Sequence, residues 1–351
     1  MEFGEVFSFK NYYRTSRKCR LGVSWKASVQ RYLMHELRNV SETLRKHRSN
    51  TYKEKPFTEF TKCENKKTRQ ITKCDIADRP TQKCMTENCL LKVLRPTLIY
   101  DNGACLSGKG IDFAKRRLHR HLEKYFRQQH TNKGYVLVFD LKSFFASIPH
   151  DILIKEVSKR IKDKRLCSLY RQLVEDFKGD KGLGLGSQIS QISAIFFLNK
   201  IDHYIKEQLH IKYYVRYMDD GVLIHESKAR LNACLSKLRT MCAELQIFLN
   251  EKKTQIASIH NGFSFLQRFW FVTASGKVVE KASKASIVRE RRKLKRMAKL
   301  RVPFNSFKQS FNSWRGSLIR CNSHNQLRRM QFLYNNILKR SKNGRIFDFA
   351  C

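Results

Sequence analysis

The sequence predicts an α+β fold in which a sheet-containing region is followed by a separate helical region at the C-terminus. Residues 135–141, YVLVFDL, form a continuous apolar run that is typical of a buried strand. Residues 213–225 contain two β-rich runs around a polar centre, which indicates a hairpin. From residue 280 onward a helical period is combined with many cations, and residues 281–301 contain only one acid, Glu290.

The charge balance indicates a polyanionic partner. The chain has 351 residues, of which 71 are Lys or Arg and 30 are Asp or Glu, and its formal net charge is +41. Such self-repulsion is usually retained where a polyanion neutralises it, so we expect nucleic acid to contact much of the surface. A ribosomal-type structural protein and a basic membrane-surface protein are the other classes that this charge allows. Disorder of the whole chain is excluded, because 41% of the residues are hydrophobic.

The cysteines and the apolar stretches predict a reducing, cytoplasmic setting without membrane contact. The eleven cysteines are odd in number and share no common spacing, as expected of reduced thiols. A zinc site at Cys63, Cys74, Cys84 and Cys89 is an alternative. No stretch approaches the roughly 18–20 apolar residues that cross a bilayer. The start, MEFGEVFSFK, lacks an apolar export segment.

The first part of the chain is expected to combine helices with short strands. Residues 1–56 form a basic arm with a helical period and solvated ends. Residues 57–110 are rich in Lys, Thr and Cys and contain a β-like piece at 68–72. A helical pattern then runs from 111 to 129 and leads into the apolar strand.

The part that follows the apolar strand mixes helices with a glycine-rich loop. Amphipathic patterns predict helices at about 150–162 and 165–178. Residues 179–188 contain four glycines, which allow the backbone to approach a ligand closely. The other expected elements are helices at 188–209 and 227–246 and strands at 247–259 and 263–273.

Three carboxylates stand out in so basic a chain. Asp140 ends the apolar strand, and Asp219 and Asp220 occupy the polar centre of the hairpin. Burying carboxylates without a cation is costly. A pair of Mg²⁺ ions held by such carboxylates is the usual apparatus for nucleotidyl transfer, in which one ion activates a 3′-hydroxyl and the other holds a triphosphate. The alternative is that Asp-Asp-Gly is only a tight hairpin turn.

The Tyr-Met-Asp-Asp segment at 217–220, flanked by apolar strands, resembles the catalytic signature of reverse transcriptases. Other segments resemble that family's motifs in the family's order, and the basic helices after 280 resemble its thumb. These segments are FDLKSFFASIPHDIL (139–153, first carboxylate motif), GLGLGSQISQ (182–191, substrate loop), LNEKKT (249–254) and FSFLQRFWF (263–271, the strand that grips the primer).

The resemblance implies a right-hand polymerase with fingers, a palm built on an antiparallel sheet, and a helical thumb. We expect the fingers at 57–134, with an insertion at about 165–190. The palm is expected at 135–279 and the thumb at 280–351, while the arm at 1–56 lacks a family counterpart. The implied partners are template RNA, the cDNA–RNA duplex and deoxynucleoside triphosphates (dNTPs), and a small accessory protein is common in the subgroup described next.

The substrate loop is similar to that of one prokaryotic subgroup. An aliphatic Leu185 before Gly186, and Gln188 after the serine, resemble the reverse transcriptases of diversity-generating retroelements. Segments 100–110 and 313–323 resemble that subgroup's second motif and thumb. These enzymes copy a template RNA with frequent errors at adenines for mutagenic retrohoming. Phage-defence reverse transcriptases, which make untemplated or protein-primed DNA, are the main alternative, and a non-catalytic RNA-binding scaffold is a third.

The resemblance also implies roles for single residues. Asp140 and Asp219 would be ligands of two Mg²⁺ ions, for which Mn²⁺ can substitute, and Asp220 would be a partial ligand or support. Phe145 would be a steric gate against a ribose 2′-hydroxyl, the atom that separates RNA from DNA precursors, although an ordinary core aromatic is the alternative.

The remaining implied site residues bind nucleotide or nucleic acid. Lys66 and Arg69 would hold the triphosphate, or else be solvated cations. Leu185 and Gly186 would lie against the incoming base and sugar. Lys253 would reach the primer–template backbone. Ser143, Phe144, Ser190 and Gln191 complete the expected substrate-binding set.

Overall fold

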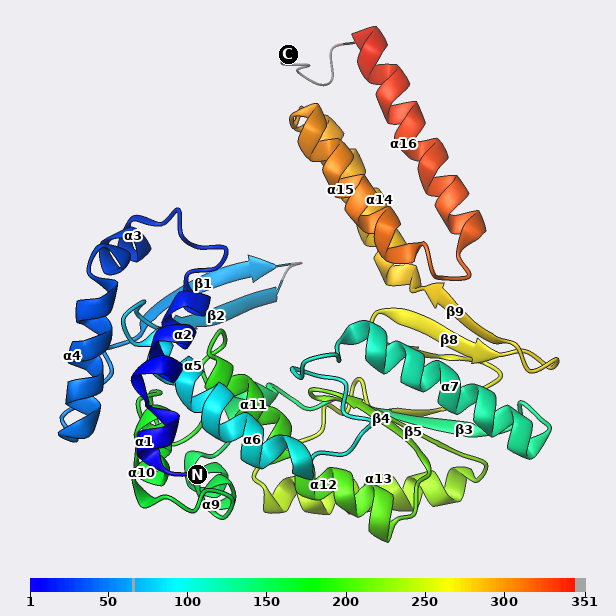
Figure 1. Cartoon of the computed structure of the whole chain (residues 1–351). Helices are drawn as coiled ribbons and strands as arrows, with labels where there is room; N and C mark the ends of the chain where they lie inside the picture. The colour runs from blue at the N-terminus through cyan, green and yellow to red at the C-terminus, as the bar shows by residue number, and fades with distance from the viewer. Residues whose placement is uncertain (65–66, 345–351) are drawn as a thin grey trace.

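The computed structural model describes residues 1–64 and 67–344. Its strands form three antiparallel sheets, and helices surround the central one (Figure 1). The described strands are β1 (Thr58–Glu64), β2 (Lys67–Lys73), β3 (Tyr135–Phe139), β4 (Tyr213–Tyr217), β5 (Asp220–His225), β6 (Gln255–Ser258), β7 (Phe263–Phe265), β8 (Arg268–Val272) and β9 (Val278–Ala282).

Helices make up most of the remaining structure. The helices before β3 are α1 (Phe3–Val6), α2 (Phe9–Cys19), α3 (Ala27–Met34), α4 (Glu36–Arg48), α5 (Arg79–Met85), η1 (Thr86–Leu90), α6 (Leu91–Leu94), η2 (Arg95–Thr97) and α7 (Ile111–Gln129). Those after it are α8 (Phe144–Ser147), α9 (His150–Ser158), α10 (Lys164–Glu175), α11 (Gln188–Phe197), α12 (Asn199–His203), η3 (Tyr204–Gln208), α13 (Lys228–Glu244), α14 (Lys284–Lys299), α15 (Phe304–Leu318) and α16 (His324–Gly344).

The central sheet has the strand order β4-β5-β3-β6. In its antiparallel register Phe139 pairs with Gly221, and Tyr217 pairs with Asp220 across a two-residue turn. The end of β3 therefore lies beside the turn of the β4–β5 hairpin. The apolar strand and the hairpin expected from the sequence are both present.

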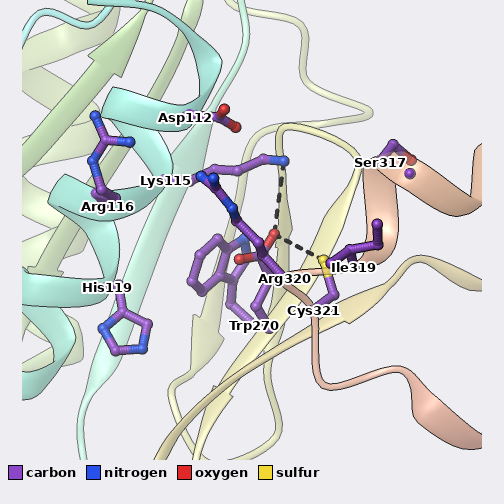
Figure 2. A pocket seen from close by; sticks show the side chains of 11 residues that line it. Asp112, Lys115, Arg116, His119, Trp270, Ser317, Ile319, Arg320 and Cys321 are labelled. Carbon is purple, nitrogen blue, oxygen red and sulfur yellow. Dashed lines mark hydrogen bonds and ion pairs between the residues drawn. The ribbon is translucent and has the colours of Figure 1, made fainter. Parts of the chain in front are cut away.

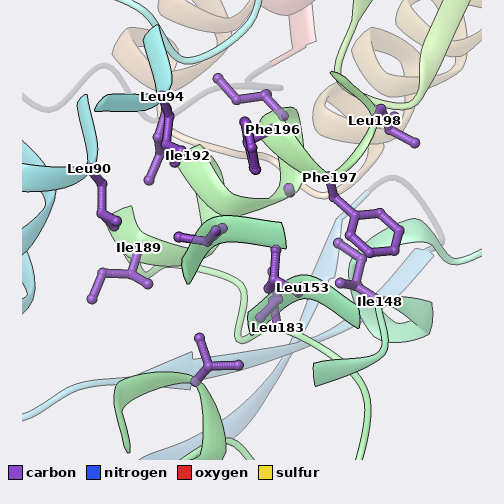
Figure 3. Close-up of a cluster of buried hydrophobic side chains, with 14 of the residues drawn as sticks. Leu90, Leu94, Ile148, Leu153, Leu183, Ile189, Ile192, Phe196, Phe197 and Leu198 are labelled. Atoms are coloured by element: carbon purple, nitrogen blue, oxygen red, sulfur yellow. The ribbon is translucent and has the colours of Figure 1, made fainter. Parts of the chain in front are cut away.

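Both faces of the central sheet are buried, which explains why β3 is apolar without alternation. Val136 and Val138 face a core shared with α7, where Leu118 lies, and with β8. Leu137 and Phe139 face a larger core shared with α13 and the helices around α11. Figure 3 shows part of that larger core, in which side chains of α11 pack against those of α6 and α9.

Beyond the central sheet, β7, β8 and β9 form a three-stranded sheet that leads into α14, α15 and α16 (Figure 1). Strand β9 ends at Ala282, so the C-terminal helices begin at Lys284, slightly later than expected. These helices pack around their own small core, centred on Leu294, Phe311 and Tyr334. The separate helical region that the sequence predicts is therefore present.

The base of the C-terminal helices is tied to β8 and β9 by a cluster of polar contacts. Glu280 accepts a hydrogen bond from the Arg268 guanidinium at 3.1 Å and lies 3.7 Å from the Lys115 ammonium. Cys321 donates to the same carboxylate at 3.4 Å. Lys115, Glu280 and Cys321 border a cavity of about 550 Å³ between α7 and the end of α15 (Figure 2). The contacts attach the helical region to the sheet that precedes it.

The N-terminal residues, expected to form a basic arm with solvated ends, pack against other parts of the chain. Tyr12 of α2 is fully buried, and its hydroxyl lies 2.9 Å from the Thr81 hydroxyl of α5. His47 of α4 contacts the same hydroxyl at 3.1 Å and stacks on Tyr52. His35 and Ser49, which flank α4, are exposed as the prediction of solvated ends requires, whereas long-range contacts anchor the interior of α2 and α4.

Two other expectations need correction. The helix expected at 188–209 is divided into α11, α12 and the π-helical η3, and only the last part of the strand expected at 247–259 is a strand, β6.

The zinc alternative has no support, because no three His, Cys, Asp or Glu side chains in residues 1–64 and 67–344 form a group that could hold a metal ion. None of the helices in this part of the chain is both long enough and apolar enough to cross a membrane.

The close contact between Gly221 and Phe139 generates a prediction. A Cβ atom at position 221 would lie 2.2 Å from the Phe139 ring, so Gly221→Ala should lower the free energy of unfolding by about 1–3 kcal/mol. The matched control is Gly316→Ala in α15, where a Cβ meets nothing within 4 Å; this variant should be more stable than wild type by about 0.5–1 kcal/mol. Urea unfolding followed by circular dichroism measures both, and a Gly221→Ala protein as stable as wild type would contradict the packing described.

Candidate active site

Asp140 is the first polar residue after β3 and is held by a short return segment. The Asn250 amide donates to the Asp140 carbonyl at 2.7 Å, and the Asn250 side chain donates to the Asp140 carboxylate at 2.9 Å. The Lys253 ammonium lies 2.8 and 2.7 Å from the two carboxylate oxygens. Asp140 is buried, whereas Lys253 is half exposed. The ion pair places Lys253 at the carboxylate, a contact that the sequence interpretation did not include.

Asp219 and Asp220 lie at the tip of the β4–β5 hairpin. Met218 has a φ of 55°, a left-handed conformation that places Asp219 at the corner of the turn. Burial raises the pKa of the Asp219 carboxyl, and the neighbouring Asp140 raises it further. Burial, followed by repulsion from Asp219 and interaction with Asp140, raises the pKa of Asp220 to about 7. Asp140 and Asp219 therefore lie close enough to Asp220 to disfavour its ionised form.

This set of donors fits a divalent cation in its chemistry. Carboxylate oxygens are the ligands that Mg²⁺ prefers, and a doubly charged ion would relieve a repulsion that Lys253 offsets only in part. The described residues do not form a ready-made group of three metal-binding side chains, and Asp140 holds Lys253 instead. A cation bound here would therefore have to displace the ammonium group.

A cavity of about 770 Å³ opens next to Asp219, a volume within the range of small-molecule sites. Its walls come from the β1–β2 hairpin, from α8 and from the glycine-rich loop before α11. Five of the predicted substrate-binding residues line it: Arg69, Ser143, Phe144, Phe145 and Leu185. The structure thus brings these residues together with one of the three carboxylates.

Backbone hydrogen bonds fix the glycine-rich loop in the cavity wall. The Leu183 amide donates to the Phe145 carbonyl at 2.7 Å, and the Thr72 amide donates to the Leu185 carbonyl at 3.3 Å. The loop therefore connects α8 with β2. The Phe145 ring is partly buried, lines the cavity and packs edge-on against Phe144, which is buried. Phe145 therefore forms part of the cavity wall, and Phe144 packs against it.

The other predicted site residues lie apart from this cavity. Gly186, with a φ of 115°, lines a separate hollow of about 360 Å³ behind the loop. Ser190 is fully buried, and its hydroxyl has no hydrogen-bond partner within the described part of the chain. Gln191 is exposed on α11 and does not line the cavity. Lys66 lies outside the described residues.

A chain of hydrogen bonds behind the glycine-rich loop was not predicted from the sequence. The Ser187 hydroxyl donates to Gln82 at 2.9 Å, and the Gln82 amide donates to Glu54 at 2.5 Å. Burial raises the pKa of Glu54 to about 8. No motif joins these residues, because they are far apart in the sequence and meet only when α5 packs beneath the loop.

A second large hollow, of about 890 Å³, borders the hairpin on the side of the C-terminal helices. Tyr217, at the start of the carboxylate turn, lines this hollow, and so do Arg289 and Lys293 of α14. The turn at Leu266 and Gln267, two residues with positive φ, forms another part of its wall. Cations of α14 thus border the same hollow as the residue that precedes the carboxylate turn, an arrangement that suits a polyanion.

Comparisons with known proteins are consistent with this architecture. Protein YkfC of Escherichia coli (strain K12) is 28% identical over 181 residues, which are 39% of this chain and 46% of that protein. The putative COX1/OXI3 intron 2 protein of Saccharomyces cerevisiae is 35% identical over 78 residues, 20% of this chain and 9% of that protein. The chain thus spans less than half the length of these curated relatives.

The structure of telomerase from Candida albicans in complex with the TWJ fragment of telomeric RNA matches with a TM-score of 0.50 and 12% sequence identity. The match covers 88% of this chain and 61% of that one. At this identity the likeness concerns the fold alone, and it confirms the expected α+β polymerase fold.

The family model described as reverse transcriptase (RNA-dependent DNA polymerase) matches residues 38–284, a range that contains β1 to β9, the three carboxylates and the cavity beside them. This chain belongs to that family.

Proposed function

We propose that the chain is an RNA-directed DNA polymerase that adds deoxynucleotides to a primer 3′-hydroxyl on an RNA template. The observation that carries the proposal is the cavity that joins Asp219 to Phe145, Leu185 and Arg69. A nucleotide in this cavity would have its sugar near Phe145 and its phosphates between Arg69 and the carboxylates. The cavity volume accommodates a nucleoside triphosphate.

Asp140, Asp219 and Asp220 would hold the divalent cations of the reaction, Mg²⁺ or Mn²⁺. Bound there, such ions supply charge neutralisation for the triphosphate and lower the pKa of the attacking hydroxyl. The chain's own contributions are positional. Asn250 and the β3–β5 register fix Asp140 beside the turn. Lys253, which pairs with Asp140 here, would be a cation available to the phosphates if a metal ion took its place.

The primer–template duplex would occupy the hollow between the hairpin and α14. Arg289 and Lys293 face it and would contact phosphates, which position a duplex without specifying its sequence. In this proposal residues 57–134 with about 165–190 act as fingers, 135–279 as palm and 280–351 as thumb. The net charge of +41 supports a long contact with RNA.

Within this activity we propose error-prone copying at template adenines, as in mutagenic retrohoming. Leu185 lines the nucleotide cavity with an aliphatic side chain, which offers no hydrogen bond to the incoming nucleotide. Discrimination between correct and incorrect pairs would then depend more on shape. A phage-defence polymerase that makes untemplated or protein-primed DNA is the second candidate, and the Leu185 variant below separates the two.

Asp219→Asn tests the catalytic role of the carboxylates. The variant should lower the dNTP incorporation rate at least about a hundredfold, because a ligand charge is lost at the transferring phosphate. RNA affinity should be unchanged, since the basic surface is intact. Primer extension and filter binding measure the two quantities. Asp151→Asn, an exposed carboxyl on α9, is the control, and wild-type incorporation by Asp219→Asn would refute the assignment.

Phe145→Ala should admit ribonucleotides, because the ring is proposed to fill the space of a 2′-hydroxyl. We expect the ratio of ribonucleotide to deoxynucleotide kcat/KM to rise roughly tenfold or more. Single-nucleotide incorporation kinetics provide the ratio. Phe332→Ala, which removes an exposed aromatic of α16, should leave it unchanged. An unaltered ratio in Phe145→Ala would make the ring a packing residue only.

Leu185→Gln should lower misincorporation opposite adenine, because the new amide can hydrogen-bond the incoming nucleotide. One such bond is worth about 0.5–1.5 kcal/mol, or up to about tenfold in discrimination. Sequencing of cDNA copied from a defined RNA measures the errors, and Leu185→Met is the aliphatic control. A wild type as accurate at adenine as at other bases would reject the mutagenic function and favour the defence polymerase.

A further inference from the structure

Arg216 is a buried cation on β4, two residues before Met218. Its guanidinium forms an ion pair with Asp202 of α12, with Nε 2.7 Å from Oδ1 and Nη2 2.5 Å from Oδ2. Both side chains are almost completely inaccessible to solvent. The Tyr214 hydroxyl donates to the same carboxylate at 2.7 Å. The charge of Arg216 is therefore already neutralised by Asp202 alone.

The remaining donors of Arg216 reach two backbone carbonyls. Nη1 donates to the Met218 carbonyl at 2.8 Å, and Nη2 donates to the Ile195 carbonyl of α11 at 2.9 Å. Met218 directly precedes Asp219, and its left-handed φ of 55° is unfavourable for a residue with a side chain. The bond from Nη1 holds the turn in this strained conformation.

The element at the other end of the guanidinium is rigid. Helix α11 begins directly after the glycine-rich loop, and its side chains Ile189, Ile192, Phe196 and Phe197 lie in the core shown in Figure 3. Arg216 thus connects the carbonyl before Asp219 to the helix that follows the nucleotide cavity wall. The hydrogen bonds to the two carbonyls are not needed to neutralise the charge of Arg216, because Asp202 already does so.

The main chain of Arg216 is anchored independently of its side chain. Its amide donates to the Asp101 carbonyl at 3.1 Å, and its carbonyl accepts from the Gly103 amide at 2.8 Å. The 101–103 loop packs closely against α7, since a Cβ atom on Gly103 would lie only 2.8 Å from the Ala114 side chain. The guanidinium therefore extends from a fixed base.

We propose that Arg216 is a positioning residue for Asp219: its planar fork fixes the Met218 carbonyl relative to α11 and so sets where the Asp219 carboxylate stands beside the nucleotide cavity. This inference rests on the proposed polymerase function. Arg216 touches neither substrate nor metal, and it acts through the backbone of the turn.

Arg216→Lys tests the fork. Lysine keeps the charge opposite Asp202, but its single ammonium cannot reproduce the separate donors of the planar guanidinium. We expect kcat for dNTP incorporation to fall about tenfold or more, as for a displaced catalytic group, while the KM for dNTP changes little. Mn²⁺ binding, titrated by electron paramagnetic resonance, should weaken by about tenfold. Amide hydrogen exchange in the peptide covering residues 213–222 should accelerate.

Arg165→Lys is the matched control. Arg165 is exposed, and it donates to the carbonyl of His47 at 3.0 Å, an arginine–carbonyl contact far from the hairpin in sequence and outside both hollows. This variant should retain wild-type kcat, Mn²⁺ affinity and exchange in residues 213–222. A parallel loss in both variants would mean that any lost arginine–carbonyl contact has this effect, and would overturn the proposal.

A triple variant, Arg216→Met with Asp202→Leu and Tyr214→Phe, removes the ion pair without leaving a buried charge or hydroxyl unpaired. Replacing a buried ion pair by apolar side chains is often neutral for stability, so this protein should fold. It should show the same loss of Mn²⁺ affinity as Arg216→Lys. Wild-type Mn²⁺ affinity and kcat in the triple variant would show that the pair only fills the core.

A wild type that binds Mn²⁺ but incorporates no nucleotide would refute the proposed function, while the Mn²⁺ and exchange measurements would still decide the role of Arg216.

Discussion

The antiparallel register of β3 against β5 is the constraint on which the candidate site depends. Because Phe139 pairs with Gly221, Asp140 leaves the end of β3 beside the turn that carries Asp219 and Asp220. A slip by one residue would reverse the faces of all the β3 side chains and separate the carboxylates. The register tolerates the large Phe139 ring only because residue 221 has no side chain. The same pairing therefore sets both the packing of the sheet and the gathering of negative charge.

The negative charge of these three carboxylates determines which charges the surrounding residues must supply. The carboxylates lie within a chain of net charge +41, and Lys253 partly neutralises them at Asp140. Cations elsewhere, such as Arg69 at the cavity and Arg289 on α14, line the two hollows, where they would contact phosphates in the proposed function. The structure thus separates two electrostatic functions: a small acidic centre suited to divalent cations, and an extended basic surface suited to nucleic acid.

Local patterns predicted the elements well, and contacts between distant residues were the part that could not be predicted. The apolar run of β3, the hairpin and α7 have periodicities that are visible over a few residues. The ion pair between Lys253 and Asp140 joins residues 113 apart, and no local pattern indicates it. The burial of Tyr12 against α5 is likewise a tertiary contact, which the local sequence of the N-terminal arm does not indicate. Gln191 was assigned to the substrate by its motif, but helical geometry turns it away from the cavity.

Primer extension by the unmodified chain on an RNA template is the most direct test of the central claim, that the carboxylates and the adjoining cavity form an RNA-directed DNA polymerase site. The account predicts template-complementary dNTP addition to a DNA primer, supported by Mg²⁺ or Mn²⁺ and abolished by a chelator. Tight RNA binding without any dNTP addition in either metal, or addition that persists after chelation, would contradict it.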